Sequence, residues 1–454
     1  MPRKFGYPRN EASRRDRIEQ REIIKLPSRD THARRDLLAN DPHRSPKNVS
    51  KLIRQLGERH VDFVLFSDSN GVWSGHGWDH GVAYGLAQIA TMYATGLSSG
   101  GDIGSFPGSR QGYGWEALPT ESPVVQTGAP AALAAFLDQP VAKQPLDYGY
   151  LASGAYTGNG GLRITSGVTM DVNAALAFDF HWGSFAAGAG EFTATVRRVS
   201  STVLNSSVIS TNTGTVEMNR SRLTVAAATR NYDIEARWAV SEATGPCFFL
   251  YTRAFNTAQS SGFSVSTLKG VNSAYTRNIL DDLQQGDDAT MTYFFGELRR
   301  GQEQADKRIV VVINFGFGDR GNNQISLGPD PVSGANANPL AYMDNLRGLI
   351  IRIREIWTAE GWDADSELFF LIAPSHPSGE ADPADASLID IYVEHAKQLE
   401  YEDDNVQVFD MRTIVNEVNM DENDWYTEAT NVHLEQGGYE FIGQRMFSDL
   451  EGTY

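Results

Sequence analysis

Two residues with complementary chemistry stand far apart in the chain, Ser69 and His433. Ser69 lies in the sequence Phe-Ser-Asp-Ser-Asn-Gly at 66–71, directly after an apolar run. A serine hydroxyl is a poor nucleophile until a neighbouring base takes its proton, and a neutral imidazole suits that task near pH 7. His433, in Thr-Asn-Val-His-Leu at 430–434, is a candidate for that base. The pair predicts attack on an acyl group, provided that the fold brings both side chains together.

The segments around both residues follow the pattern of an α/β domain. Nearly continuous apolar runs predict parallel strands that are buried on both faces, at 61–69, 308–316, 367–374 and 405–411. Helical spacing of apolar residues predicts helices at 45–56, about 79–94, 339–357, 385–401 and 437–450. Because strands and helices alternate with short connections, we expect a doubly wound sheet with helices on both faces. Ser69 would then lie beyond the carboxyl end of the first strand, where ligands collect in such sheets.

The middle of the chain has a different texture. Residues 151–280 are rich in Ser, Thr, Ala and Gly, and short alternating stretches, from LRITSGV to FSVSTL, recur about every ten residues. This spacing predicts an antiparallel β-sandwich, with a jelly-roll-like arrangement of strands. We therefore divide the chain into a basic arm (1–44), an α/β domain in two parts (45–150 and 286–454) and an inserted β domain (151–285).

The composition limits the classes of molecule that the protein could bind. The formal net charge of −18 argues against general affinity for nucleic acid, whose phosphates would repel the chain. The Arg-rich segment 1–44 has too few apolar residues for a core, so it is either a solvated tail or an arm that orders on a protein partner. The single cysteine, Cys247, excludes an intramolecular disulfide framework and argues against a zinc site built from cysteines.

The sequence predicts neither a membrane span nor a signal peptide. No apolar run approaches the roughly 18 residues of a spanning helix, and the first twenty residues lack an apolar stretch. The location of the protein stays open at this stage. Assembly into a virus particle needs no cleavable signal, so it remains one of the alternatives.

The motifs around Ser69 and His433 resemble those of the SGNH (GDSL-like) hydrolases. In that family the nucleophile follows the first strand in a Gly-Asp-Ser motif, and the sequence at 67–70 matches it except at the leading glycine. The family histidine precedes the last helix and is often followed by Gly-Tyr, as His433 is by Gly438 and Tyr439. The resemblance covers about half of the chain. It implies a three-layer α/β/α, flavodoxin-like fold and a serine esterase.

The resemblance also implies an oxyanion hole, from which the chain departs at one position. The family places an Asn in a Gly-x-Asn-Asp motif, whereas Gly318 stands at that place here. Loss of such a donor typically lowers turnover about 10²- to 10³-fold, unless Asn322 or Asn323 substitutes for it. The other donors would be the backbone N–H of Ser69 and that of a loop glycine, Gly114 or Gly112.

The residue that orients the histidine is altered as well. Thr430 stands three residues before His433, where the family has an Asp, and a threonine cannot stabilise an imidazolium by charge. Three alternatives stay open: the hydroxyl of Thr430, a nearby acid such as Asp424 or Glu428, or a dyad that a backbone carbonyl orients.

A second polar group lies at 76–80. His76, Asp79 and His80 are residue types that bind zinc, but their short spacing lacks a distant further ligand. We therefore favour contact with substrate, or capping of a helix by Asp79, and expect no metal. The glycine-rich segments lack the Lys-Ser/Thr ending of a phosphate loop, so no cofactor is expected.

Two hypotheses of function follow. The first is a serine esterase that removes acyl groups, most plausibly acetyl, from a carbohydrate. Its carbohydrate part is implied by the resemblance, since viral hemagglutinin-esterases are similar in carrying a lectin-like β domain inserted in such a hydrolase. The alternative is a virion or surface protein for assembly or adhesion, which keeps the hydrolase scaffold with weak or no catalysis.

Overall fold

The structure is a computed structural model of the chain. It describes 48–68, 176–184, 190–198, 202–215, 217–226, 234–240, 247–256, 262–271, 276–285, 308–315, 339–374, 383–410, 433–451 and shorter pieces between these ranges. The predicted arm at 1–44 lies outside them. No helix in the described ranges is long and apolar enough to cross a membrane.

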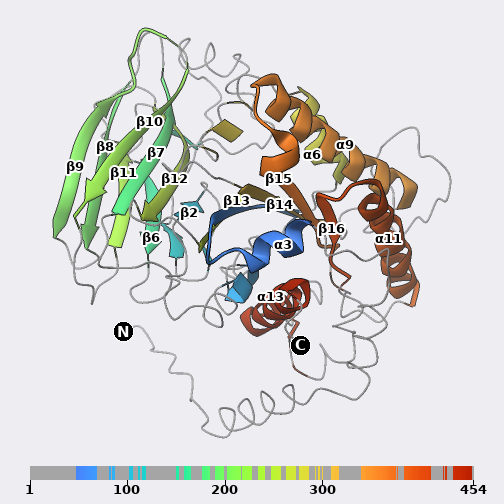
Figure 1. Cartoon of the computed structure of the whole chain (residues 1–454). Helices are drawn as coiled ribbons and strands as arrows, with labels where there is room; N and C mark the ends of the chain where they lie inside the picture. The colour runs from blue at the N-terminus through green and yellow to red at the C-terminus, as the bar shows by residue number, and fades with distance from the viewer. Residues whose placement is uncertain are drawn as a thin grey trace, which may run out of the picture.

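A parallel sheet forms one half of the molecule (Figure 1). Its strands lie side by side in the order β13-β1-β14-β15-β16. Of the strands that come after β1 in the chain, β13 thus lies on one side of β1, and β14, β15 and β16 lie on its other side. Such a reversal is the place where ligands bind in doubly wound sheets. The strand bounds are β1 His60–Asp68, β13 Gly262–Val271, β14 Arg308–Asn314, β15 Leu368–Ile372 and β16 Val406–Val408.

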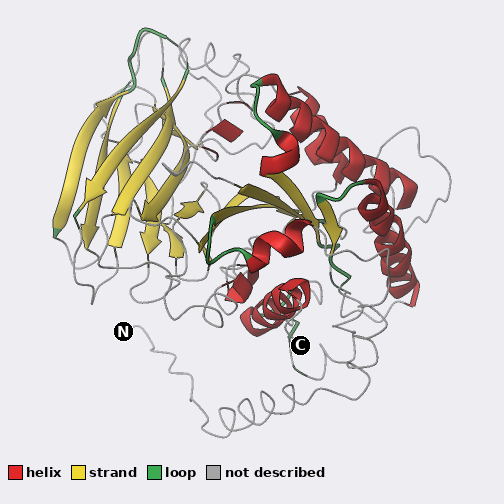
Figure 2. Ribbon diagram, in the orientation of Figure 1, coloured by secondary structure: helices red, strands yellow, loops and turns green. Residues whose placement is uncertain are grey.

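Helices cover both faces of this parallel sheet (Figure 2). On one face, apolar side chains of the strands pack against α6 (Thr276–Gln285), α9 (Pro339–Ala359) and α11 (Pro383–Glu402). On the other face they pack against α3 (Asn48–Arg54) and α13 (Gln436–Glu451). The short helix α10 (Ala364–Glu367) precedes β15. Strands that are covered twice need apolar residues at every position, which explains the uninterrupted runs in β14 and β15.

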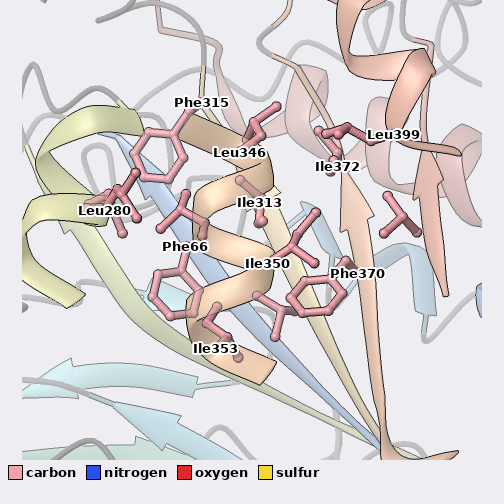
Figure 3. Packing of buried hydrophobic residues seen from close by; sticks show 14 of the residues in the cluster. Phe66, Leu280, Ile313, Phe315, Leu346, Ile350, Ile353, Phe370, Ile372 and Leu399 are labelled. Atoms are coloured by element: carbon pink, nitrogen blue, oxygen red, sulfur yellow. The ribbon is translucent and has the colours of Figure 1, made fainter. Parts of the chain in front are cut away.

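The layer between β14 and α9 shows how the first face is filled (Figure 3). Phe66, Ile313 and Phe370 come from three neighbouring strands, and Ile350 and Ile353 lie on one side of α9. All five side chains are buried. Burying an aliphatic or aromatic side chain of this size contributes about 1.5 to 3 kcal/mol, so this layer stabilises the position of the strands strongly.

Antiparallel strands form the other half of the molecule. Four of them continue the parallel sheet beyond β13 in the order β2-β12-β7-β10, so ten strands, counting β5 on β12, belong to one sheet. Six more form a second sheet in the order β3-β4-β6-β11-β8-β9. The bounds are β2 Asp102–Ser105, β3 Gln111–Gly112, β4 Trp115–Leu118, β5 Tyr150–Ala152, β6 Gly158–Ile164, β7 Leu176–Gly183, β8 Glu191–Arg198, β9 Val203–Ser210, β10 Met218–Val225, β11 Ile234–Val240 and β12 Cys247–Asn256.

The two sheets share a separate apolar core. Phe178, Phe180 and Trp182 of β7 face the second sheet, where Phe192 and Trp238 are buried against them. The rings of Trp182 and Phe192 meet edge to face with centroids 5.9 Å apart. Alternate residues of these strands therefore point inward, as in a β-sandwich. The jelly-roll-like connectivity stays a prediction.

The pairing of some strands corrects the sequence interpretation. The stretch FSVSTL was assigned to the sandwich, but β13 pairs in parallel with β1 from Gly262 opposite His60 to Val271 opposite Asp68. Its alternation of apolar residues with Ser and Thr is typical of a strand with one solvated face, and the partner strand is about 200 residues away. Local periodicity cannot report such a partner. Conversely, β3 and β4, at 111–118, join the six-stranded sheet. The domain boundaries at 45, 151 and 286 stay predictions.

Candidate functional site

The carboxyl end of β1 carries the candidate nucleophile. β1 lies between β13 and β14, and its last residue, Asp68, pairs with Val271. Ser69 is the next residue in the chain and lies outside the described ranges. Its predicted place, one residue beyond a central parallel strand at the reversal of strand order, rests on the described position of Asp68.

A buried network of hydrogen bonds joins the carboxyl ends of the strands next to the predicted position of Ser69. The hydroxyl of Ser67 donates to Oδ1 of Asn314 (3.2 Å), and the amide Nδ2 of Asn314 donates to the carbonyl oxygen of Ala373 (2.7 Å). Ser67, Asn314 and Ala373 are fully buried at the carboxyl ends of three adjacent strands: Ser67 is the second-last residue of β1, Asn314 is the last residue of β14, and Ala373 directly follows β15. Buried polar groups are costly unless they are paired, so this network holds the three carboxyl ends in one arrangement.

His433 is buried at the start of the segment that leads into α13. Its residue is 8% exposed, and Leu434 directly after it forms an antiparallel bridge with Tyr426. Burial lowers the pKa of the His433 imidazole to about 4, because the charged form loses its hydration. The ring is therefore neutral near pH 7, and a neutral imidazole can accept a proton.

Several contacts hold the backbone around His433. The N–H of Leu434 donates to the hydroxyl of Tyr439 (3.4 Å), and the N–H of Glu435 donates to the carbonyl oxygen of Trp425 (2.6 Å). His376, which is fully buried after β15, packs its ring edge to face against Tyr439 at 6.2 Å between centroids. These groups fix the segment that carries His433 against the strand ends of the parallel sheet.

Glycines bring two helical segments into backbone contact. Gly81 and Gly85 lie in helical residues that follow Ser69 in the chain, and Gly443 lies in α13, which follows His433. A Cβ atom on Gly443 would overlap the carbonyl of Gly81, and one on Gly85 would overlap the carbonyl of Gly443. Gly81 also has no room for a side chain, because a Cβ atom there would lie 2.5 Å from the carbonyl oxygen of Tyr439. Only glycine permits this close approach.

Of the site residues predicted from the sequence, the structure describes His433. The other predicted catalytic and oxyanion residues lie outside the described ranges, as do the alternatives Glu428 and Asn323 and the group at 76–80. These predicted catalytic and oxyanion residues are Ser69, Thr430, Asp424, Gly114, Gly318 and Asn322. Gly112, the alternative oxyanion glycine, is the last residue of β3 and pairs with Trp115. Within the described ranges, no three His, Cys, Asp or Glu side chains gather as a metal site requires.

The sequence interpretation missed the supporting residues. Asn314 had a usable signal, since it ends an otherwise apolar buried strand at the edge where Ser69 was expected. His376 and Tyr439 gave a weaker signal, because a histidine after a strand and a tyrosine in a helix are common. Their packing against one another joins residues 63 positions apart, which no motif records.

Comparison with known proteins leaves the family open. No family model matches the chain, and no curated protein matches it. Among solved structures, the acetylxylan esterase Axe2 from Geobacillus stearothermophilus is 17% identical over 43% of this chain and 74% of that chain, with a TM-score of 0.27. The lipase Lip_vut3 from a goat rumen metagenome is 16% identical over 42% of this chain and 80% of that chain, with a TM-score of 0.28.

A further solved structure is similar to part of this chain. TmCBM61, solved in complex with beta-1,4-galactotriose, is 11% identical over 34% of this chain and 88% of that chain, with a TM-score of 0.19. At such identities and TM-scores these likenesses carry no conclusion about activity.

Proposed function

We propose that the protein is a serine hydrolase of the SGNH type that removes acyl groups, with O-acetyl groups of a carbohydrate as its substrate class. Ser69 is the nucleophile in this proposal, and His433 is the general base and then the general acid. The proposal combines the described position of His433 with the predicted position of Ser69 beyond β1.

One observation carries the proposal: the backbone contact between Gly81 and α13. Gly81 follows Ser69 by twelve residues, and its neighbour Tyr439 follows His433 by six. Segments that are far apart in the chain therefore converge shortly after each of the two residues. Because β1 ends at Asp68 beside the network of Ser67 and Asn314, this convergence supports a shared site at the carboxyl edge.

The proposed reaction proceeds in two steps. His433 takes the proton of the Ser69 hydroxyl while the Ser69 oxygen attacks the ester carbonyl, and the tetrahedral oxyanion receives hydrogen bonds from the N–H groups of Ser69 and Gly114. Collapse of this intermediate breaks the bond to the alcohol, which leaves with the proton from His433. A water molecule, activated by His433, then releases the acid and regenerates Ser69.

His433 is neutral near pH 7, as the first proton transfer requires, while burial, which lowers its pKa to about 4, also makes the imidazole a weaker base. Orientation of the ring by Thr430 or Asp424 belongs to the proposal, as does the oxyanion contact of Asn322 in place of an Asn at Gly318. A missing donor would lower turnover about 10²- to 10³-fold without changing which residue is acylated.

The carbohydrate part of the proposal draws support from the way in which the β-sandwich is attached. β2 pairs with both β12 and β13, so the sandwich continues the sheet of the candidate site without an intervening linker at this point. A β-sandwich joined to the sheet in this way is compatible with a polymeric substrate. Acetylated glycans, in preference to small free esters, are the substrate class that we propose.

The test is hydrolysis of p-nitrophenyl acetate and of acetylated glycans by the full-length protein. We expect Ser69→Ala and His433→Ala to lower turnover roughly 10⁴- to 10⁶-fold, because the two residues act as one unit. Ser207→Ala on β9 and His395→Gln on α11 replace the same residue types elsewhere and should leave turnover unchanged. Hydrolysis by the wild type that does not exceed that by Ser69→Ala would end the proposal.

A further inference from the structure

A bond between side chains joins the carboxyl end of β1 to β14. The register of these parallel strands ends with Ser67 opposite Asn314, where the Ser67 hydroxyl donates to Oδ1 of Asn314 at 3.2 Å. Ser69, the proposed nucleophile, follows two residues later in the chain. The bond therefore lies at the last position at which β1 pairs with β14 before the proposed nucleophile.

The pairing of β1 with its other neighbour, β13, is irregular close to the same end. Leu65 lies opposite Thr267, but Phe66 lies opposite Lys269, so the pairing skips one residue of β13. A skipped residue disrupts the ladder of backbone hydrogen bonds locally. The place of Ser67 therefore depends more strongly on its contact with β14 than on its contact with β13.

Both halves of the Asn314 amide are engaged. Oδ1 accepts the hydrogen bond from Ser67, and Nδ2 donates to the carbonyl oxygen of Ala373 at 2.7 Å. Because the amide oxygen accepts and the amide nitrogen donates, one orientation of the side chain satisfies both partners. All three residues are fully buried, so a lost bond leaves a polar group without water in the core. Asn314 thus links the ends of three strands in one geometry.

The network lies on the face of the sheet that α13 covers. Side chains alternate between the two faces along a strand, so Ser67 shares its face with Leu65, and Asn314 shares its face with Val312. Leu65 and Val312 belong to the core cluster that also contains residues of α13 and Leu434, the neighbour of the proposed base. The network and the segment that carries the proposed base therefore occupy the same face.

We propose that Asn314 is a positioning residue for the nucleophile, an inference that rests on the proposed function. Through Ser67 it fixes the point at which the chain leaves β1 and reaches Ser69. Ser67 stands where the SGNH pattern has a glycine, and a glycine has no side chain that could form this bond. Asn314 also precedes Gly318 by four residues, so the same amide ties the turn of the nucleophile to the loop of the predicted oxyanion residues.

The proposal predicts an effect on turnover rather than on substrate binding. A displacement of about 1 Å at a reacting group can lower turnover about 10²-fold, even when the changed residue is distant from the chemistry. Ser67 and Asn314 are fully buried, so neither side chain contacts a substrate. We therefore expect kcat to fall and KM to stay the same when the bond is removed.

The experiment measures kcat and KM for p-nitrophenyl acetate in the full-length protein, at a temperature at which circular dichroism shows each variant folded. Asn314→Leu removes both bonds and should lower kcat about 10²-fold. Ser67→Ala leaves the bond from Asn314 to Ala373 in place, so about a tenfold loss is expected. Since it removes a single hydroxyl, Ser67→Ala also provides the test if Asn314→Leu fails to fold.

Asn405 offers a matched control at the opposite edge of the sheet. It is a buried asparagine directly before β16, and its Nδ2 donates to the carbonyl oxygens of Asp365 and Leu368 at 2.8 and 3.2 Å. Asn405→Leu therefore breaks comparable bonds at the amino ends of the strands and should leave kcat unchanged. An equal loss of kcat in Asn405→Leu and Asn314→Leu would indicate a general loss of structure and overturn the positioning role.

The remaining outcomes separate this proposal from the proposed function. Wild-type turnover that does not exceed that of Ser69→Ala ends both. Wild-type turnover that depends on Ser69, together with an unchanged kcat in Ser67→Ala and Asn314→Leu, overturns the positioning role alone. The double variant Ser67→Ala/Asn314→Leu should be about as slow as Asn314→Leu, because both changes remove the same bond. Losses that multiply would contradict action through Ser67.

Discussion

Two strands of the ten-stranded sheet, β14 in its parallel half and β7 in its antiparallel half, bury their polar groups in different ways. In the parallel half, β14 is apolar from Ile309 to Ile313, and its one buried polar side chain, Asn314, stands at the carboxyl end. In the antiparallel half, β7 is buried at all eight positions yet carries Asp179 and His181 in its interior. β14 thus carries its buried polar side chain at the strand end, whereas β7 carries two along the strand.

The partners of these groups explain the difference. Asp179 receives two hydrogen bonds from Arg222, at 2.7 and 2.9 Å, and the side chain of Arg222 stays 24% exposed. Ser67 and Asn314 have fully buried partners, and none of the three groups in their network reaches water. Polarity along β7 is compensated by residues that can rehydrate, whereas polarity at the end of β14 depends on one fixed arrangement. The network at the end of β14 should therefore be less tolerant of substitution than the ion pair of Asp179 on β7.

The largest effect on stability is expected for Asn314→Leu. The similar volume fills the site, but the Ser67 hydroxyl and the Ala373 carbonyl lose their partner inside the core. Each unsatisfied buried group costs about 1 to 3 kcal/mol, so we expect a loss of about 3 kcal/mol in the free energy of unfolding. Urea denaturation followed by circular dichroism measures it. The double variant Ser67→Ala/Asn314→Leu removes the orphaned hydroxyl and should recover part of the loss; no recovery would argue against the network.

The next prediction concerns the way in which His433 makes the free energy of unfolding depend on pH. Its pKa is about 4 in the folded protein and near 6.5 in the unfolded chain, so the unfolded chain binds the proton first as the pH falls. The stabilising contribution is complete above about pH 6.5 and is lost as the pH falls toward 4, by about 3 kcal/mol in total. Unfolding free energies of the wild type and of His433→Gln between pH 4 and 7.5 test this. Identical slopes for the two proteins would contradict it.

The smallest effect is expected for Asp179→Asn in the antiparallel half. The substitution keeps the shape and removes the charge, while Arg222 and Arg220, which also lies 3.8 Å from Asp179, can turn toward solvent, so the loss is that of charged hydrogen bonds, about 1.5 to 3 kcal/mol. Urea denaturation of this variant beside Asn314→Leu compares the two halves directly. A greater loss for Asp179→Asn than for Asn314→Leu would contradict the lower tolerance that we expect at the end of β14.

The sequence predicted the parallel half well because its signal is local. The apolar runs at 308–316 and 367–374 and the helical spacing at 339–357 and 437–450 correspond to β14, β15, α9 and α13 within a few residues. The position of His433 just before the last helix is confirmed as well, since α13 begins at Gln436. The apolar pattern of a buried strand or an amphipathic helix lies within a few consecutive turns or residues, so it can be recognised without knowledge of distant partners.

What the sequence could not predict depends on distant partners. β13 resembled a sandwich strand because its partner β1 is about 200 residues away, and Asn314 finds its partners across 247 and 59 residues. The predicted nucleophile and the predicted oxyanion and orienting residues stay predictions. Their roles depend on side-chain positions that neighbouring motifs suggest but cannot fix.

The pairing of Ser69 with His433 is tested most directly by active-site labelling with a fluorophosphonate, followed by mass spectrometry of the digested protein. We predict one adduct per chain, on Ser69, and a labelling rate that falls at least about 10³-fold in His433→Ala, because the imidazole must take the proton of the hydroxyl. An adduct on another residue, or equal labelling of Ser69 in both proteins, would contradict a site built from Ser69 and His433.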